Sequence, residues 1–239
     1  MYRLLMKSVV CSSILIMLLS ACQKSQTAET ITVVADIEGN QYQTVQIGSQ
    51  LWMAENLRSG RYCNGDVIPN VQDSIQWGNL NYGAWVHMNN NPSNEVPYGK
   101  LYNWYAVNDQ RNICPCGWHV ATDAEWNTLV RYLDNNYNPT IIGGQSIIAG
   151  GKIKAVGTQY WKEPNAGATN ESGFSAQPGG SRGDFITFYG INQASYWWTA
   201  SVESQGDMPY FRRVYFEDTW LDRSFGLKNF GMSVRCVKN

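Results

Sequence analysis

This 239-residue chain has few charged side chains: Asp, Glu, Lys and Arg make up only 15% of it, and the formal net charge is -1. Domains that bind nucleic acids show a basic patch or a strongly basic composition. The near-neutral balance therefore predicts no nucleic-acid partner. Histidine is also scarce, since His87 and His119 are the only two. A catalytic histidine needs a nucleophile or a metal beside it. We interpret His119 as a packing or capping residue and predict no catalytic residue.

The N-terminal apolar run, residues 14–19, is too short for a membrane-spanning helix, which needs about 20 apolar residues. It follows the positive Arg3 and Lys7 and precedes Ser20 and Ala21, a layout typical of an export signal. Residues 19–22, Leu-Ser-Ala-Cys, resemble the lipobox of bacterial lipoproteins. This resemblance implies that residues 1–21 are removed and that acyl chains such as palmitate are attached to Cys22.

The lipid would anchor the protein in the cell envelope, and we expect the outer membrane. Residues 22–30 are polar and show no apolar periodicity, so they are predicted to form a flexible tether. The remaining stretch, residues 31–239, has the size of one globular domain.

Cysteine usage supports an exported protein. Of the six cysteines, Cys11 leaves with the signal and Cys22 is the predicted lipidation site. The four that remain are Cys63, Cys114, Cys116 and Cys236. An even number in an oxidising compartment predicts two disulfides, and four cysteines allow three connectivities. Cys114 and Cys116 are poorly placed to bond to each other. A zinc site is the competing interpretation, but Cys-x-Cys without a nearby His pair has the wrong spacing for it.

Ten tryptophans and abundant glycine indicate short strands, many turns and a Trp-rich core. The clearest helix is predicted over residues 123–135, where Thr122 and Glu125 can form a capping box. Its Trp126, Leu129, Val130 and Leu133 follow helical spacing. Short helices are also predicted within 100–107 and 147–156. Strands are predicted over 31–36, 42–47, 50–55, 173–177, 185–188, 196–200, 210–216 and 232–238. Helices early and strands late predict an α+β domain, with a turn-rich excursion over 60–97.

Six segments together resemble the Fibrobacter succinogenes major paralogous domain, a family of exported and often lipid-anchored bacterial proteins. They are IGSQLWMAENL (47–57), YGKLYNWYAV (98–107), CPCGWHVATDAEW (114–126), GFSAQPGG (173–180), YWWTAS (196–201) and SVRCV (233–237). The resemblance covers about residues 45–238 and brings no agreed biochemical activity with it. The last two segments, YWWTAS and SVRCV, also resemble the C-type-lectin-like fold. This second resemblance is an analogy of fold alone.

The resemblance also has implications for individual residues. Cys114 and Cys236 match family cysteines and are expected to pair, which leaves Cys63 for Cys116. Many relatives have a cysteine where this chain has Pro97. The tryptophans inside the quoted segments are expected in the core: Trp52, Trp104, Trp118, Trp126, Trp197 and Trp198.

Two observations suggest ligand-binding residues. Glu163-Pro164-Asn165 matches a run that supplies calcium and sugar ligands in C-type lectins, although the Trp-Asn-Asp run found there is missing here. Tryptophans in predicted loops, including Trp161 and Trp220, have the chemistry to stack on sugar rings. Trp161, Glu163, Asn165 and Trp220 are therefore the candidate ligand-binding residues. No cofactor and no metal are predicted, with calcium as the alternative.

The leading hypothesis is a non-catalytic envelope lipoprotein that binds an extracellular glycan or protein, or acts in adhesion. The alternatives are an enzyme on a related fold, such as a formylglycine-generating-like oxidase, and a purely structural envelope component. The expected partners are the membrane, through the lipid anchor, and a polysaccharide or an envelope protein.

Overall fold

The structure is a computed structural model that describes residues 32–184 and 188–239. The predicted signal at 1–21, the lipidation site Cys22 and the tether at 22–30 lie outside the described residues. Within the part that is described, no helix has the length and apolarity required to cross a lipid bilayer.

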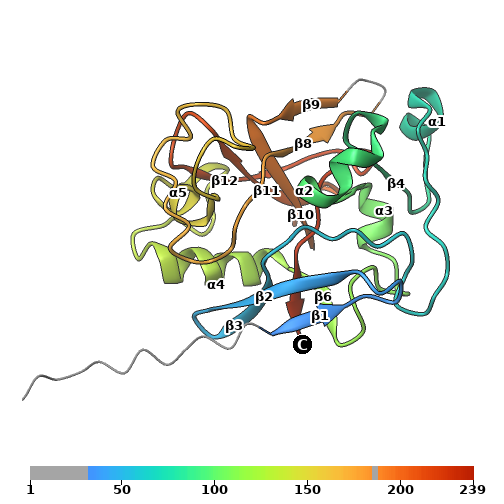
Figure 1. Cartoon of the computed structure of the whole chain (residues 1–239), viewed down its shortest axis with the longest axis horizontal. Coiled ribbons are helices and arrows are strands. Elements are labelled where there is room, and N and C mark those ends of the chain that lie inside the picture. The colour runs from blue at the N-terminus through green and yellow to red at the C-terminus, as the bar shows by residue number, and fades with distance from the viewer. Residues whose placement is uncertain (1–31, 185–187) are drawn as a thin grey trace, which may run out of the picture. The chain divides into compact units, whose positions relative to one another are not determined.

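The first sheet joins the two ends of the domain (Figure 1). Its strands, in spatial order, are β1 (Val33–Ala35), β2 (Gln41–Ile47), β3 (Gln50–Met53), β13 (Cys236–Lys238) and β6 (Trp118–Val120). All neighbouring pairs are antiparallel. The predicted strands at 31–36, 42–47 and 50–55 are confirmed with slightly shifted ends. The predicted strand at 232–238 is shorter, because Met232 and Ser233 form only isolated bridges to Tyr102 and Trp197.

The second sheet contains β7 (Gly143–Ser146), β12 (Leu221–Phe225), β11 (Pro209–Tyr215), β10 (Ala194–Val202), β8 (Gly179–Arg182) and β9 (Phe188–Ile191) in that order. Its pairs are antiparallel except β10 with β8. The predicted strands at 196–200 and 210–216 are confirmed as β10 and β11. The strand predicted at 173–177 is wrong, because Ser175 adopts a φ of 54° there and breaks the extended backbone. Residues 185–187 of the strand predicted at 185–188 are not described.

The helices are short: α1 (Ser74–Gly78), α2 (Glu95–Tyr98), α3 (Trp104–Val107), α4 (Asp123–Leu133) and α5 (Ala149–Ile153). Two 3₁₀ turns, η1 (Met88–Asn90) and η2 (Pro92–Asn94), precede α2, and a small sheet pairs β4 (Trp85–Val86) with β5 (Leu101–Tyr102). The helix predicted at 123–135 is confirmed, and Thr122 and Glu125 form the capping box. The helix predicted within 100–107 is confirmed only as α3, because residues 101 and 102 belong to β5. The α+β class follows from these elements.

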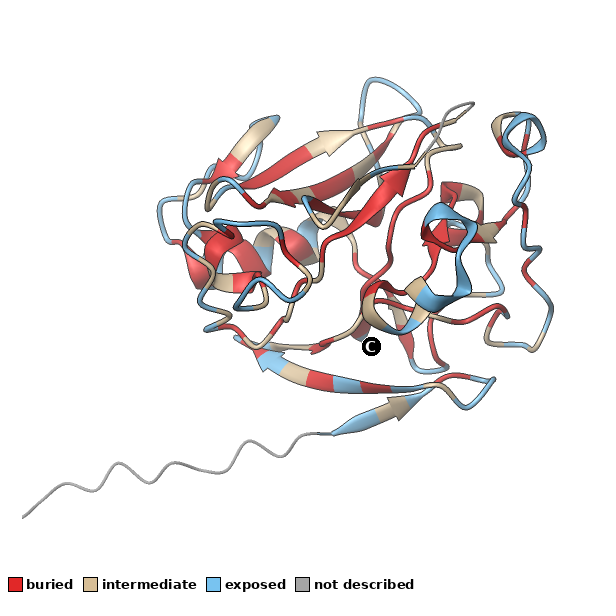
Figure 2. Ribbon diagram, turned by 45° about the horizontal axis from the view of Figure 1, so that its top comes forward, coloured by how far each residue is buried: buried red, intermediate tan, exposed pale blue. Residues whose placement is uncertain are grey.

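Tryptophans on neighbouring positions of β10 build two cores on opposite faces of the second sheet. Trp197 packs under α4 with Trp126, Trp52 and Phe174, and their ring centroids lie 5.1–5.8 Å apart. Trp198 points to the other face and packs in the core that contains the Cys114–Cys236 bond. Alternation of side chains along a strand explains the pair. Figure 2 shows the buried residues along these strands and on α4.

The six tryptophans that the family segments place in the core are all buried. The turn-rich stretch at 60–97 also has a core of its own, in which Trp77 is fully buried beside Val86, Met88 and Leu101. This stretch is therefore a packed part of the domain.

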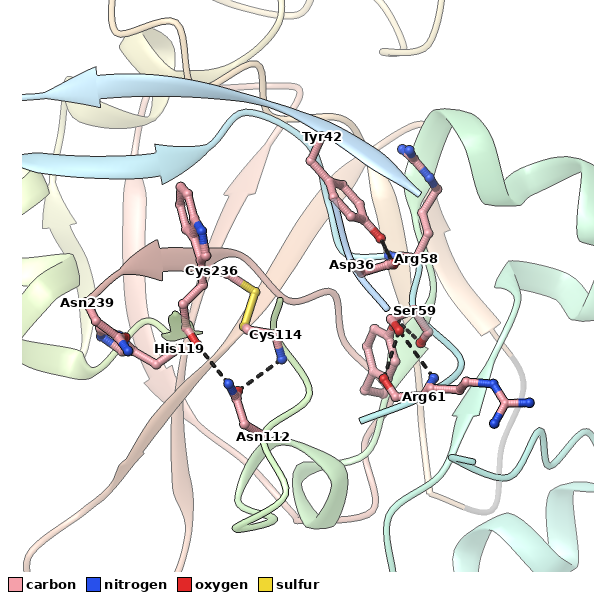
Figure 3. The surroundings of a disulfide bond; sticks show 12 residues. Asp36, Tyr42, Arg58, Ser59, Arg61, Asn112, Cys114, His119, Cys236 and Asn239 are labelled. Atoms are coloured by element: carbon pink, nitrogen blue, oxygen red, sulfur yellow. Dashed lines mark hydrogen bonds between the residues drawn. A yellow bond between two sulfur atoms is a disulfide. The ribbon is translucent and has the colours of Figure 1, made fainter. Parts of the chain in front are cut away.

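Two disulfides form among the described residues, Cys114–Cys236 and Cys63–Cys116, and these are the pairs that the family resemblance implied. The first joins residues 122 apart and is fully buried, whereas Cys116 is exposed. Figure 3 shows the buried bond beside Asn112, whose side chain accepts a hydrogen bond from the Cys114 amide and donates one to the Trp118 carbonyl.

This pairing predicts the redox state of the native protein. Alkylation with iodoacetamide before reduction, followed by peptide mass spectrometry, is expected to leave all four cysteines unlabelled because each is bonded. A label on any of Cys63, Cys114, Cys116 or Cys236 in the folded protein would contradict the pairing. It would also favour the oxidase alternative, whose chemistry needs a reduced cysteine.

Candidate functional site

A cavity of about 380 Å³ lies where β3, α2 and the loop before β8 meet. Three of the segments that carry the family resemblance reach it, and we call it the motif pocket. Its lining is Gln43, Ala54, Glu55, Asn56, Val96, Pro97, Gly99, Tyr160, Ser175 and Gln177. This volume is at the lower end of the range for small-ligand sites, about 300–1,000 Å³.

A buried hydrogen-bond network holds the floor of the pocket. The Asn56 amide donates to the Tyr98 carbonyl and to Ser233 Oγ, and its Oδ1 accepts from Trp197 Nε1 and Arg235 Nε. Arg235 is 1% exposed and donates further to the Met53, Phe174 and Ser175 carbonyls.

Arg235 therefore fixes two walls of the motif pocket at once. Its carbonyl acceptors lie at the end of β3 and in the loop before β8, two segments that are far apart in the sequence. Burial lowers the pKa of this guanidinium to about 9, so it is charged at neutral pH.

Two backbone positions bring the walls together. Gly99 has a φ of 77°, and a Cβ there would lie 2.6 Å from Asn56 Cβ, so a glycine is required for α2 to end against the floor. Ser175 has a φ of 54° without being glycine. Asn170 stabilises it by accepting from the Ser175 amide and donating to Ser175 Oγ. Backbone strain of this kind clusters at binding sites.

The rim of the motif pocket is polar and nearly neutral. Glu55 accepts from the Gln43 amide at 2.9 Å and pairs with Arg58 Nη1 at 2.7 Å. Tyr160 packs edge-on against Tyr98 with ring centroids 5.9 Å apart. Asn192 donates to both the Tyr98 hydroxyl and the Tyr160 carbonyl. These contacts hold the Tyr160 ring in place at the pocket.

Ionic contacts of Glu95, the first residue of α2, hold this helix in position. Glu95 Oε2 lies 2.5 Å from His87 Nε2, and its Oε1 lies 3.3 Å from Lys100 Nζ. Burial raises the pKa of Glu95, but the hydrogen bond from His87 and the charge of Lys100 outweigh it and hold that pKa below the usual value. The ionised Glu95 thus fixes the helix whose Val96 and Pro97 line the pocket.

The structure does not assemble the four candidate ligand-binding residues into one exposed site. Trp161 is 2% exposed and donates from Nε1 to the Ala176 carbonyl. The prediction that its ring stacks on a sugar is therefore wrong. Asn165 is also buried, and its amide donates to the Ala155 and Gly157 carbonyls. Glu163 is exposed. Trp220 is 49% exposed and lies against Gly144.

Lys154 links the two loops that contain these residues. It is fully buried, and its ammonium donates to the carbonyls of Ala166, Tyr215 and Asp218 at 2.7–2.9 Å. Burial lowers its pKa to about 8, which leaves it mostly protonated at neutral pH. The cation between these loops therefore belongs to the chain itself. Across residues 32–184 and 188–239, no group of three or more His, Cys, Asp or Glu side chains is arranged to bind a metal ion.

Two other sequence features have structural roles. His119 bridges Glu125 Oε1 at 2.7 Å and Asn239 Oδ1 at 2.6 Å, which extends the capping box of α4 as expected for a capping residue. Residues 179–183 read Gly-Gly-Ser-Arg-Gly, which fits the Gly-x-Ser-x-Gly pattern of a nucleophile elbow. An elbow exposes its serine on a strand-to-helix turn. Ser181 instead lies inside β8, fully buried, and donates to the Gly231 carbonyl.

The residues of the motif pocket were missed as a site, although most of them lie in the quoted segments. Polar Glu55 and Asn56 follow a buried strand, and Ser175 and Gln177 stand beside Phe174 and Ala176. These polar residues, which stand inside otherwise apolar family segments, are the sequence signal that could have indicated a binding site.

The chain is thus an α+β domain in which three of the six quoted segments converge on one pocket. The family model of the Fibrobacter succinogenes major domain matches residues 45–238, and the chain belongs to this family. Searches of curated proteins and of solved structures gave no match, so the likeness to the C-type-lectin-like fold stays a prediction.

Proposed function

We propose that this protein is a non-catalytic lipoprotein of the cell envelope that binds a glycan in the motif pocket. The observation that supports this most directly is the convergence of three family segments on a cavity lined by carboxylate, amide, hydroxyl and phenol groups. The expected export signal and the lipidation of Cys22 would place the domain on the envelope, in the outer membrane. There the bound glycan would serve attachment or adhesion.

The chemistry of the lining suits a sugar better than an apolar ligand. Sugar hydroxyls need both donors and acceptors, which Gln43, Glu55 and Gln177 supply. The Tyr160 ring offers an aromatic face or edge for the C–H groups of a sugar. A preformed pocket also reduces the ordering cost of binding.

Removal of the aromatic ring is the sharpest test of this site. Tyr160→Ala is expected to weaken binding of any recognised oligosaccharide about tenfold, because the stacking surface is lost. The full mature chain, purified in a zwitterionic detergent that contains no sugar, is first screened on a glycan array. The glycans it retains are then titrated calorimetrically against both proteins.

Trp220→Ala is the matched control, since it removes an exposed aromatic ring away from the pocket. It should leave the affinity unchanged. A loss confined to Trp220→Ala would move the site to the Trp220 surface. Failure of the native protein to retain any glycan would overturn the proposal.

A further inference from the structure

The motif pocket combines an apolar part with a polar part. Ala54, Val96 and Pro97 supply the apolar lining. Val96 is an apolar residue that is 79% exposed. Glu55, Ser175 and Gln177 supply polar groups in the same cavity. A ligand that fills this space needs a small apolar group next to hydrogen-bonding groups. A sugar with hydroxyls alone leaves the apolar part in contact with water.

The charges around the pocket favour a neutral ligand. Glu55 is the one charged residue of the lining, among the residues that the structure describes, and Arg58 already pairs with it at 2.7 Å. A free amino sugar would need an unpaired carboxylate for its ammonium group. An acidic sugar would meet a carboxylate and no lining cation.

One acceptor in the lining lacks a donor. Gln177 Oε1 is buried and accepts no hydrogen bond. The Asn56 amide, by contrast, is fully engaged with Tyr98, Ser233, Trp197 and Arg235. A buried acceptor without a partner is unfavourable. Rotation of the Gln177 side-chain amide, which lines the pocket, would turn this oxygen toward an N–H group of a ligand.

We propose that the motif pocket recognises the N-acetyl group of an N-acetylated hexosamine. The acetyl methyl packs on Ala54, Val96 and Pro97, and the amide N–H donates to Gln177 Oε1 after the Gln177 side-chain amide rotates to bring this oxygen to the pocket. The group is neutral, as the paired Glu55 requires. This inference rests on the proposed glycan binding and deepens it by naming the class of sugar.

The experiment compares three soluble tetrasaccharides that share β-1,4 linkages and differ at carbon 2. The N-acetylated chitotetraose is expected to bind about tenfold more tightly than cellotetraose and than the fully deacetylated amino form. This factor corresponds to one buried methyl group and one hydrogen bond. Titrations use the full mature chain in the zwitterionic detergent.

Val96→Ser tests the pocket without endangering the fold, because Val96 is largely exposed. It is expected to reduce the preference for chitotetraose over cellotetraose to about threefold, since the apolar contact for the methyl is lost. Ile75→Ser on α1 is the matched control, as Ile75 is 70% exposed and lies outside the pocket lining. It should leave the tenfold preference intact.

The outcomes separate the two proposals. Equal binding of all three tetrasaccharides would overturn the N-acetyl assignment and leave glycan binding standing. A preference that Val96→Ser does not change would overturn the assignment to this pocket. No binding of any oligosaccharide here or on the array would overturn both. Two further arms, purified peptidoglycan sacculi and mucin, identify whether the N-acetylated sugar comes from the bacterial wall or from outside the cell.

Discussion

Arg235→Met is expected to lower the free energy of unfolding by about 3 kcal/mol, because several buried acceptors lose their donor at once. The guanidinium donates to the side chain of Asn56 and to the carbonyls of Met53, Phe174 and Ser175, and it lies 4.2 Å from the Phe174 ring centroid. Methionine fills much of the space but donates no hydrogen bond. Urea denaturation with the disulfides intact measures the difference.

Arg235→Lys should also destabilise the domain, because one ammonium group cannot reproduce the planar fork that reaches acceptors in three segments. Arg111→Met is the surface control. Arg111 stacks on Tyr62 and pairs with Asp66 and Asp109 in solvent, where such contacts contribute little. If Arg235→Met and Arg111→Met caused equally small losses, the buried network would not hold the domain together.

Removal of the buried disulfide should have the largest effect of all. Cys114→Ala with Cys236→Ala opens a loop of 122 residues, which the chain-entropy account values at about 5 kcal/mol. The change also removes two sulfur atoms from a fully buried core beside Tyr102, Trp104 and Met232. We expect the variant to unfold at much lower urea concentration or to fail to accumulate in folded form.

Cys63→Ala with Cys116→Ala provides the comparison. This bond joins residues only 53 apart, and Cys116 is exposed, so its removal should cost less and leave the core intact. In a dithiothreitol titration read by alkylation and mass spectrometry, the Cys63–Cys116 bond should be reduced first. Simultaneous reduction of both bonds, or equal losses of stability, would contradict the ranking.

The fold could be predicted where the signals are local. The capping box and the four-residue stripe of α4 lie within twelve positions of one another, and strands β2, β3, β10 and β11 are rich in apolar and aromatic residues. Two of the missed strands, β7 and β12, lack such signals. β7 reads Gly-Gly-Gln-Ser, and β12 contains Asp222 and Arg223. Asp222 pairs with Arg213 on the neighbouring strand β11, and Arg223 pairs with Asp123, which is 100 residues away in the sequence.

The candidate site could not be predicted for the same physical reason. Asn56 meets Ser233 across 177 residues and Trp197 across 141. The polar residues are therefore visible in the sequence, but their convergence is not. Trp161 and Asn165 were predicted to be exposed ligand-binding residues, because the composition around them is typical of a loop. Trp161 Nε1 and the Asn165 amide instead satisfy backbone carbonyls of the segments that pack on that loop.

Lys154 has a consequence for the conditions in which this domain keeps its shape. A loop pair closed by a bound ion opens when the ion is diluted or chelated, so its conformation depends on what the surroundings supply. Here the positive charge is attached to the backbone through its own side chain and meets three carbonyls inside the domain. Its effective concentration is fixed by covalent connection, and the loops at 163–167 and 215–220 hold together independently of the ions in the surrounding solution.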